Sequence, residues 1–456
     1  MFKSLVSAVR SPVLIRLSIR RQQNAISSVT TTRGLQSTAG DALTHHRTNA
    51  NGGSDTKSRR RCVSTASSEP QIFTWGTNRK GSLLQASVED GKLADVPTRV
   101  ENWRSLIGDD VASDVTIREI VCGAAETALV LSDGRCYVCG ENKNGQLGLG
   151  HKDPVTEPTL LKLPPGENNE TVTVQSIALG PTFSAVIDNN GDLYSFGYGG
   201  STLGDGLGFL GHGDGESYLL PKLVESLVED GCFAKKVQVG KSHMTVLTTE
   251  GEVLTCGAGA YGRLGNLETH EDQTFLAPVE MLQSGVTDIS GGKSFTMALK
   301  DDGVLYGWGR GDKGQLGTGF GLAVDMYNMA SVPEPIEADE LFGRKVIKVS
   351  SGGSHAVCIT EGGEVFQWGM SLYLEPVRVS ELLNTNIVDV ACGDNYSLAL
   401  DEKGRLYSWG QSKTGVLGQG SVKQLNQAQL IEALEDKKVT SISAGWQTVA
   451  CFAEYA

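Results

Sequence analysis

Cys392-Gly393-Asp394-Asn395-Tyr396-Ser397-Leu398-Ala399-Leu400, followed by Lys403-Gly404 and then Leu406-Tyr407-Ser408-Trp409-Gly410, is the stretch that decides the fold. Its glycines Gly393 and Gly404 are eleven residues apart, and Gly410 follows six residues later. The same spacing recurs in five further copies, at Gly123/Gly134/Gly140, Gly180/Gly191/Gly197, Gly240/Gly251/Gly257, Gly292/Gly303/Gly309 and Gly352/Gly363/Gly369. Six copies in one register indicate a repeat protein.

Each copy is expected to form two strands joined by a tight turn. Alternating apolar residues follow the first glycine, as in residues 127–131, and a dipeptide such as Asp133-Gly134 or Asn190-Gly191 comes next. These dipeptides supply the positive backbone φ that a hairpin turn requires. A short strand rich in aromatic residues then ends in the third glycine, as in residues 305–309.

Two more strands are expected in each copy. Four copies continue into a glycine-rich turn with a central leucine, and a Pro-containing extended segment usually follows; the turns are residues 145–148, 262–265, 314–317 and 415–418. A further apolar run, such as residues 346–349, leads into the next copy. The copy at Gly369 lacks the glycine-rich turn, so only 41 residues separate Gly369 from Gly410. Four short strands per copy are the content of one propeller blade.

The number of blades follows from the short strands that end in glycine. Seven such ends occur, at Gly76, Gly140, Gly197, Gly257, Gly309, Gly369 and Gly410. The first, residues 72–76, has no preceding strand and turn, whereas the unit that starts at Gly445 stops before its turn glycine. We therefore expect an all-β, seven-bladed β-propeller, closed by pairing of the N-terminal strand at 71–76 with the C-terminal blade.

The repeat resembles the regulator of chromosome condensation repeat over residues 70–456. This resemblance implies a seven-bladed propeller, but function depends on loops and faces that the repeat leaves variable. His243 and His355 share one repeat position that holds Phe or Tyr in other copies, which is typical of a packing position. The resemblance implies that a histidine there bonds neighbouring backbone and stabilises its blade.

Residues 1–65 differ from the repeats in composition. They hold eleven Lys or Arg and two acids, a net charge of +9, and no acid precedes Asp41. Residues 13–21 can form an amphipathic helix with arginines on one side. Such an Arg-rich, Ser-rich, acid-free segment is typical of a mitochondrial transit peptide. We expect residues 1–65 to be a disordered basic extension of this kind; a basic tail with a nuclear signal at residues 57–61 is the alternative.

The remainder of the chain is strongly acidic. The net charge is −13 for the whole chain and +9 for residues 1–65, which leaves −22 on the propeller. A surface of this charge repels nucleic-acid phosphates, so no DNA binding is expected. No run of 18 apolar residues occurs, and no transmembrane segment is expected.

No residue pattern predicts catalysis. Cys136 and Cys139 are three apart on one expected strand, so they point to opposite faces, and no second pair completes four zinc ligands. The triplets Gly240-Lys241-Ser242 and Gly292-Lys293-Ser294 resemble the end of a phosphate-binding loop but lack its upstream glycine. We therefore expect no enzyme activity and no catalytic residue, cofactor or metal.

An insertion follows the third of the strand-ending glycines, Gly197. Aligned with residues 145–150, residues 208–213 lie six residues further from the preceding repeat glycine. Propellers place specificity in such loops, so we predict a protruding partner-binding loop. Its contact residues are predicted to be Tyr198, Ser201, Thr202, Leu203, Asp205 and Leu207. A tolerated surface insertion is the alternative.

These observations favour a non-enzymatic protein-interaction scaffold in mitochondria, in the matrix or associated with the inner membrane. The resemblance to organellar members implies support for assembly of a ribosome, an RNA-processing complex or the respiratory chain. The alternative is a guanine nucleotide exchange factor for a small or dynamin-like GTPase. A cytoplasmic or nuclear location is the alternative to the mitochondrial one. The family's exchange factor for the Ran GTPase has a wedge that extends from its third blade. The resemblance implies that residues 198–207, which follow the third strand-ending glycine, would take this place here.

Overall fold

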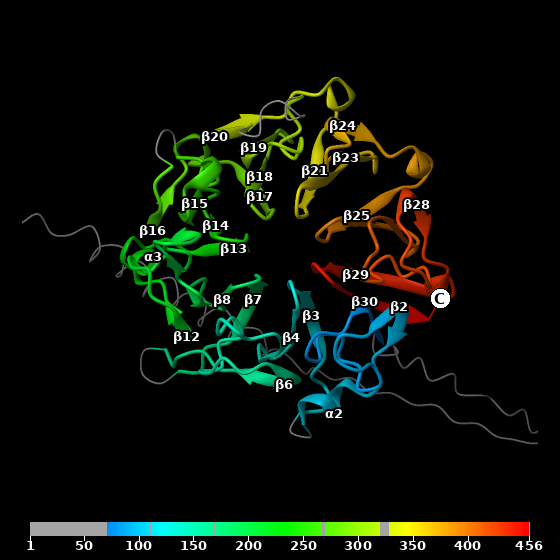
Figure 1. Cartoon of the computed structure of the whole chain (residues 1–456), viewed down its shortest axis with the longest axis horizontal. Helices are drawn as coiled ribbons and strands as arrows, with labels where there is room; N and C mark the ends of the chain where they lie inside the picture. Colours follow the sequence, from blue (N-terminus) through cyan, green and yellow to red (C-terminus); the bar gives the residue numbers. More distant parts are fainter. Residues whose placement is uncertain (1–70, 109–110, 167–169, 267–269, 320–327, 456) are drawn as a thin grey trace, which may run out of the picture. The chain divides into compact units, whose positions relative to one another are not determined.

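The computed structural model describes residues 71–108, 111–166, 170–266, 270–319 and 328–455. These residues form seven four-stranded antiparallel sheets arranged around a common centre (Figure 1). The prediction of an all-β, seven-bladed propeller is thereby confirmed. The basic segment 1–65, with its expected transit peptide, lies outside the described residues.

Each sheet is one blade, and the blades are numbered by the order of their strand-ending glycines, from Gly76 in blade 1 to Gly410 in blade 7. From the inner to the outer strand, the blades consist of the following strands: blade 1, β29 (Lys437–Ala444), β30 (Thr448–Tyr455), β1 (Gln71–Thr77) and β2 (Leu93–Arg99); blade 2, β3 (Ile117–Cys122), β4 (Glu126–Leu131), β5 (Cys136–Gly140) and β6 (Val155–Leu161); blade 3, β7 (Val174–Leu179), β8 (Phe183–Asp188), β9 (Leu193–Gly197) and β12 (Tyr218–Leu223); blade 4, β13 (Ala234–Val239), β14 (His243–Thr248), β15 (Val253–Gly257) and β16 (Gln273–Pro278); blade 5, β17 (Val286–Gly291), β18 (Phe295–Lys300), β19 (Leu305–Arg310) and β20 (Met329–Pro335); blade 6, β21 (Val346–Ser351), β22 (His355–Thr360), β23 (Val365–Gly369) and β24 (Tyr373–Arg378); blade 7, β25 (Ile387–Cys392), β26 (Tyr396–Asp401), β27 (Leu406–Gly410) and β28 (Leu425–Leu430).

The remaining elements are short. In the described part of the chain, two helices and a two-stranded hairpin lie between the blade strands: α2 (Trp103–Ile107), α3 (Glu225–Glu229), and β10 (Gly200–Ser201) with β11 (Gly206–Leu207). Single 3-10 turns occupy η2 (Ala260–Gly262), η3 (Glu280–Leu282), η4 (Asp339–Leu341), η5 (Ser380–Leu382) and η6 (Glu432–Leu434). No helix in the described ranges has the length and apolar character needed to cross a membrane.

The repeat glycines are required by the backbone. Gly303 turns β18 into β19 with a φ of 87°. Gly309, which ends the aromatic strand, has a φ of 100°, and a Cβ on it would lie 2.6 Å from the carbonyl oxygen of Ser294. Only glycine accepts this conformation and this close approach, which explains the fixed spacing in the sequence.

Blade 1 is built from two distant segments. β1 pairs antiparallel with β30 in a continuous register that runs from Gln71 opposite Ala453 to Gly76 opposite Thr448. β29 then pairs with the other side of β30. This is the pairing expected for residues 71–76, and it gives blade 1 the same four strands as the other six blades.

A leucine from the turn after the third strand is inserted at the junction with the next blade. Six such leucines are at most 2% exposed: Leu83, Leu147, Leu210, Leu264, Leu316 and Leu417. The carbonyl just before the leucine accepts a hydrogen bond from the next blade, as when Trp308 Nε1 donates to Arg263 O at 3.1 Å and Trp368 Nε1 donates to Gln315 O at 3.0 Å. Each junction therefore buries an apolar side chain and satisfies a buried polar group.

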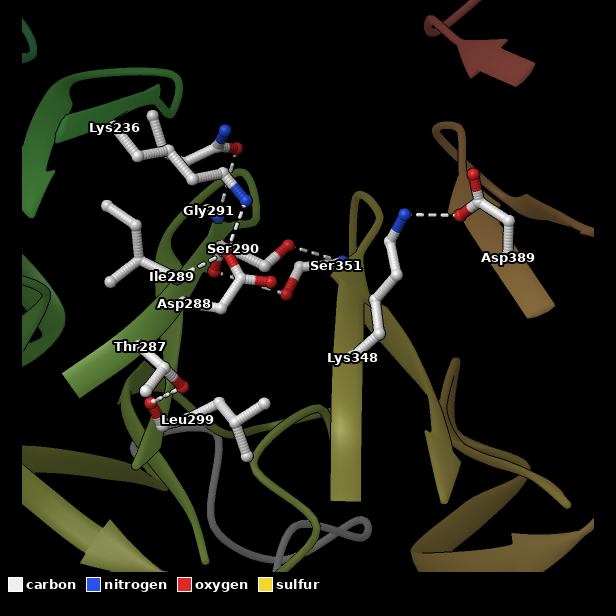
Figure 2. Close-up of polar contacts among 11 residues, drawn as sticks. Lys236, Thr287, Asp288, Ile289, Ser290, Gly291, Leu299, Lys348, Ser351 and Asp389 are labelled. Carbon is white, nitrogen blue, oxygen red and sulfur yellow. Dashed lines mark hydrogen bonds and ion pairs between the residues drawn. The ribbon is translucent and has the colours of Figure 1, made fainter. Parts of the chain in front are cut away.

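The inner strands are joined across blades by polar contacts. Lys236 on β13 lies 2.5 Å from Asp288 on β17, and Lys348 on β21 pairs with Asp389 on β25 (Figure 2). Between these pairs, the amide of Ser351 donates to Ser290 Oγ at 2.8 Å. The two ion pairs and the serine contact between them therefore link the inner strands of blades 4 to 7.

Candidate interaction face

The inserted residues form a hairpin on one face of the propeller. β10 and β11 pair antiparallel, with Gly200 opposite Leu207 and Ser201 opposite Gly206. The hairpin follows β9 of blade 3 and reaches the neighbouring blade 4. Leu203, at its tip, is 98% exposed. An apolar side chain with this exposure is suited to contact with another molecule.

Asp272 anchors the hairpin to blade 4. Its Oδ2 accepts the backbone amide of Leu207 at 2.9 Å, and its Oδ1 accepts that of Gly259 at 3.0 Å. Gly206 has a φ of 98°, and a Cβ on it would lie 2.5 Å from the Cβ of Ala258. The hairpin is therefore held against blade 4 by a carboxylate and by a contact that only glycine permits.

The six predicted loop residues have different environments. Thr202, Leu203 and Asp205 are exposed at the tip, and Ser201 is half-buried on β10. Leu207 is also half-buried, in the strand that returns to the blade. The tip therefore holds three of the predicted residues where a partner can reach them.

Tyr198 differs from the other five because it packs within the blade. Its ring meets that of Phe209 edge-on, with the centroids 5.7 Å apart. Its backbone amide donates to Thr182 O at 3.0 Å. The structure thus places Tyr198 at the base of the hairpin, as part of its support.

A hollow of about 910 Å³ lies beside the hairpin tip. Thr202 and Asp205 line one side of it, and loops of blades 3 to 7 and of blade 1 line the rest. Its charged lining residues are of both signs: Lys241, Arg263, Lys293, Arg310 and Lys313, with Asp205, Asp272, Asp312 and Asp394. Five cations and four carboxylates make this face much less acidic than the propeller average. We call this hollow together with the hairpin the hairpin face.

A tyrosine between two guanidinium groups forms part of the hollow. The ring of Tyr261 has Arg263 at 5.4 Å and Arg310 at 5.0 Å from its centroid. Arg310 is paired with Asp312 through two hydrogen bonds of 2.8 and 2.7 Å. Arg263 is 5% exposed and donates to Ala260 O and Ser242 Oγ. Burial lowers the pKa of Arg263 to about 10, so the group remains charged at neutral pH and is held rigidly.

At the centre of the face, a cluster from three blades spans the entrance to the inner channel. Lys293 Nζ lies 2.5 Å from Asp394 and 4.4 Å from the ring centroid of Trp446. Lys293 and Trp446 line both the hollow and a second cavity of about 430 Å³, which the inner strands surround. The ion pair and the cation–π contact therefore lie where the hollow and the inner cavity adjoin.

These central residues were missed by sequence reasoning, although a signal for them exists. Lys241, Lys293, Asp394 and Trp446 each follow the first glycine of their repeat. The Gly-Lys-Ser triplets lack the rest of a phosphate-binding loop, yet both of their lysines line the hollow. The position after the first glycine varies from copy to copy, and this variation on a fixed scaffold marks a surface site.

The candidate catalytic groups occupy packing positions. Burial raises the pKa of Cys136 and Cys139 to about 12, and the two side chains belong to different parts of the core. Within the described residues, no group of His, Cys, Asp and Glu could hold a metal ion.

The two histidines are also structural. Nε2 of His243 lies 3.1 Å from Thr296 Oγ1, and Nε2 of His355 lies 3.0 Å from Ser397 Oγ. These two hydrogen bonds are to side-chain hydroxyls of the next blade, and His355 also has the kind of backbone partner that the resemblance implied, at Tyr396. Burial lowers the pKa of His243 to about 3 and that of His355 to about 4. Both side chains are therefore neutral at physiological pH and join adjacent blades.

The fold and the hairpin face define a class of protein, a seven-bladed propeller with one hairpin projecting from its third blade. The family model described as RCC1-like domain matches residues 60–375, and models of the regulator of chromosome condensation (RCC1) repeat match residues 403–452 and 387–415. The chain belongs to the RCC1-like domain family.

Three relatives of this chain are named for different roles. The chain is 31% identical to the ultraviolet-B receptor UVR8 of Arabidopsis thaliana over 67% of this chain and 62% of the receptor. It is 32% identical to the secretion-regulating guanine nucleotide exchange factor of Mus musculus, over 69% and 63%. It is 27% identical to the RCC1 domain-containing protein RUG3, mitochondrial, of Arabidopsis thaliana, over 84% and 75%. The chain spans less than two thirds of the first two of these proteins.

Solved structures share the fold. Prp20p of Saccharomyces cerevisiae, described with its binding properties to Gsp1p and histones, superposes with a TM-score of 0.72 at 20% identity, over 85% of this chain and 92% of that one. Human WBSCR16 superposes with a TM-score of 0.68 at 21% identity, over 85% and 99%. At these identities the similarity concerns the fold alone.

Proposed function

We propose that this protein is a non-enzymatic interaction scaffold of mitochondria, in the matrix or at the inner membrane, and that it docks a protein partner on its hairpin face. The observation that carries the proposal is the anchored hairpin, whose exposed Leu203 stands at the rim of the 910 Å³ hollow. An apolar tip beside charged and aromatic groups is the composition of a protein-binding surface. The docked partner would belong to an assembling ribosome, an RNA-processing complex or the respiratory chain.

The mitochondrial location rests on two supports. Residues 1–65 have the composition of a transit peptide. RUG3, a relative whose name includes the word mitochondrial, is 27% identical to this chain, and the alignment covers 84% of the chain. Import of the full chain carrying a C-terminal fluorescent tag, compared with a version lacking residues 1–65, tests this part. If both versions stay outside mitochondria, the location is wrong.

Site-specific photo-crosslinking tests the docking face. A photoreactive residue at Leu203 should crosslink one major partner in mitochondrial extract. The matched control is Leu220, an apolar residue of the same blade that is 59% exposed but lies on the outer strand β12. Equal products from the two positions would show that the hairpin has no special role.

A second candidate, guanine nucleotide exchange on a small or dynamin-like GTPase, is favoured by the position of the hairpin. It follows β9 of blade 3, where the family resemblance implies a wedge, and an exchange factor is among the relatives. Release of a fluorescent guanine nucleotide from candidate GTPases should accelerate with the wild-type protein and slow when residues 200–207 are replaced by a short glycine linker. If release is unchanged while the folded content is intact, exchange is not the function of the hairpin.

A further inference from the structure

The junction between blades 6 and 7 lacks the leucine that is present in the other six. In blade 7, Gly410 pairs with Leu425, so fourteen residues, 411–424, form the turn. In blade 6, Gly369 pairs with Tyr373, so the turn is only residues 370–372. Met370 and Ser371 adopt φ values of 55° and 59° to reverse the chain in this short distance. The turn therefore cannot reach the next blade.

A cavity of about 220 Å³ lies at this junction. Its lining includes Trp409 and Leu425 of blade 7, and Gln367, Leu372 and Tyr373 of blade 6. An engineered apolar cavity of about 150 Å³ is large enough to hold benzene, so this space can receive one apolar side chain. Leu372 and Tyr373 at its rim are 66% and 37% exposed, so the cavity is open to a partner.

The hydrogen bond of Trp409 reflects the missing turn. At three of the other six junctions the indole N–H of the next blade binds the carbonyl before the turn leucine, as in the bond of 2.8 Å from Trp75 Nε1 to Val416 O. Trp409 Nε1 instead donates to the side-chain Oε1 of Gln367 at 2.7 Å. Gln367 stands two residues before its repeat glycine, where Ser408 and Thr255 each donate to the carbonyl of their own turn leucine. Gln367 thus replaces an absent main-chain partner.

The other junctions also define the sequence that fits beside the indole. The glycine after the turn leucine lies against the ring of the next blade. A Cβ on Gly265 would lie 2.9 Å from Trp308 Nε1, and one on Gly418 would lie 3.1 Å from Trp75 Nε1. A leucine followed by glycine, with a free carbonyl before the leucine, is therefore the complement of such a junction.

We propose that the cavity beside Trp409 is a docking socket for a leucine-glycine turn presented by a protein partner. The partner's leucine enters the 220 Å³ space, and its preceding carbonyl replaces Gln367 Oε1 as the acceptor of the Trp409 indole N–H. Met370 to Tyr373 form the rim over which the partner's chain enters and leaves. The partner completes blade 6 in the way that each glycine-rich turn completes its own blade. This socket is separate from the hairpin, so the proposal stands independently of the function proposed above.

The indole resonance of Trp409 gives a direct test. The chain has six tryptophans, so the full-length protein labelled with ¹⁵N-Trp gives six indole signals, and Trp409→Phe assigns one of them. The probe is a cyclic peptide with the sequence of residues 414–418, Thr-Gly-Val-Leu-Gly. Its control carries alanine in place of leucine. We expect a saturable shift of the Trp409 signal, with binding of the alanine peptide weaker by about tenfold or more. No shift, or equal shifts with both peptides, would overturn the proposal.

A turn graft provides the second measurement. Replacing residues 370–372 by a copy of residues 411–424 preserves the pairing at both ends and supplies the missing leucine. The grafted protein should show the peptide-saturated Trp409 signal without peptide and should not respond to it. A graft with alanine for that leucine should still respond. If the grafts do not fold, the titration of the wild-type chain decides alone.

Two other occupants are distinguished by the same signal. A Trp409 resonance that moves with protein concentration in the absence of peptide would identify a second copy of the chain as the occupant. If the Trp409 signal of the wild-type protein without peptide already matches that of the graft, the occupant of the socket would be residues 1–70 of the chain itself. Either outcome would overturn the assignment to a partner.

Discussion

Asp272 of blade 4 accepts the backbone amide of Leu207, which belongs to the hairpin of blade 3, at a distance of 2.9 Å. This carboxylate therefore helps to fix where the inserted hairpin lies, together with the close approach of Gly206 to blade 4. Because Asp272 also accepts the amide of Gly259, it ties two neighbouring blades at the rim of the hollow. The hairpin is consequently a positioned part of the face.

Asp272→Asn should loosen the hairpin. Asparagine keeps one acceptor oxygen but places an amide where the second was, so one of the two backbone hydrogen bonds is lost, with an effect of about 0.5–1.5 kcal/mol. Hydrogen exchange of the Leu207 or Gly259 amide should accelerate by about three- to tenfold. Glu271→Gln, at the adjacent exposed carboxylate, is the control and should leave both amides unchanged. Unaltered exchange in Asp272→Asn would show that the hairpin is held by other contacts.

Gly206→Ala should disorder the hairpin, whereas Gly204→Ala should not. At Gly206 the positive φ and the Cβ contact with Ala258 both oppose a side chain, and we expect a loss of about 1–3 kcal/mol of local stability. At Gly204 the nearest atom to a new Cβ is 3.9 Å away. Limited proteolysis at the hairpin should distinguish the two variants. Equal protection of both would mean that the close approach of Gly206 to blade 4 does not hold the hairpin in place.

Glu126 should make the stability of the propeller depend on pH. Burial raises its pKa from 4.5 to about 7 in the folded state. The folded protein then binds more protons than the unfolded chain between about pH 4.5 and 7, so the free energy of unfolding should fall as pH rises through this window, by about 3 kcal/mol in total.

Urea unfolding from pH 5 to pH 8 measures this dependence, and Glu126→Gln is the comparison. Glutamine does not titrate, so the variant should lose stability less steeply over the same range. The carboxylate accepts hydrogen bonds from Ala125 N and Gln146 Nε2, and the glutamine side chain has only one acceptor oxygen. The variant should therefore be less stable by a constant amount at every pH. Parallel pH curves for the wild type and the variant would show that Glu126 does not carry the effect.

Ser441→Lys should add a third ion pair between neighbouring inner strands. Lys236 and Lys348 each pair with a carboxylate on the next blade. Glu119 occupies the same strand position, but the preceding blade offers Ser441 there. A lysine at 441 should pair with Glu119, stabilise the fold by about 0.5–1 kcal/mol, and lower the pKa of Glu119, which burial raises.

A double-mutant cycle with Glu119→Gln isolates this pair, with thermal unfolding as the measurement. The gain from Ser441→Lys should disappear when Glu119 is replaced. A gain that persists without the carboxylate would arise from the lysine stem and not from the ion pair.

The spacing of glycines was sufficient to predict the blades, because each glycine performs a backbone task that no other residue can perform. Gly309, for example, must approach Ser294 closely. The turn of blade 1 was not recognised, because Leu84 stands where other turns have their second glycine and adopts a φ of 58°. The fold thus follows from the spacing of the repeat glycines, and the few turns that depart from this spacing are identified only by the three-dimensional structure.

The binding face was less accessible from sequence. The insertion could be located by counting residues, but its support by Asp272 joins positions 65 residues apart. Lys293, Asp394 and Trp446 meet only because the ring brings three blades to one centre. Trp409 likewise donates to the side chain of Gln367 and not to a main-chain carbonyl. This contact joins two blades, and the spacing of glycines does not predict it.

The composite structure of blade 1 has a consequence for how the protein is made. Trp75 on β1 is fully buried in the finished ring, where it lies opposite Val449 on β30. The other six blades are contiguous in sequence and can form as the chain leaves the ribosome or a translocation channel. β1 emerges early and has no partner for its inner edge until β30 has followed. Throughout this interval an apolar strand edge stays uncovered, and we expect the nascent protein to be most prone to aggregation until its last strands are released.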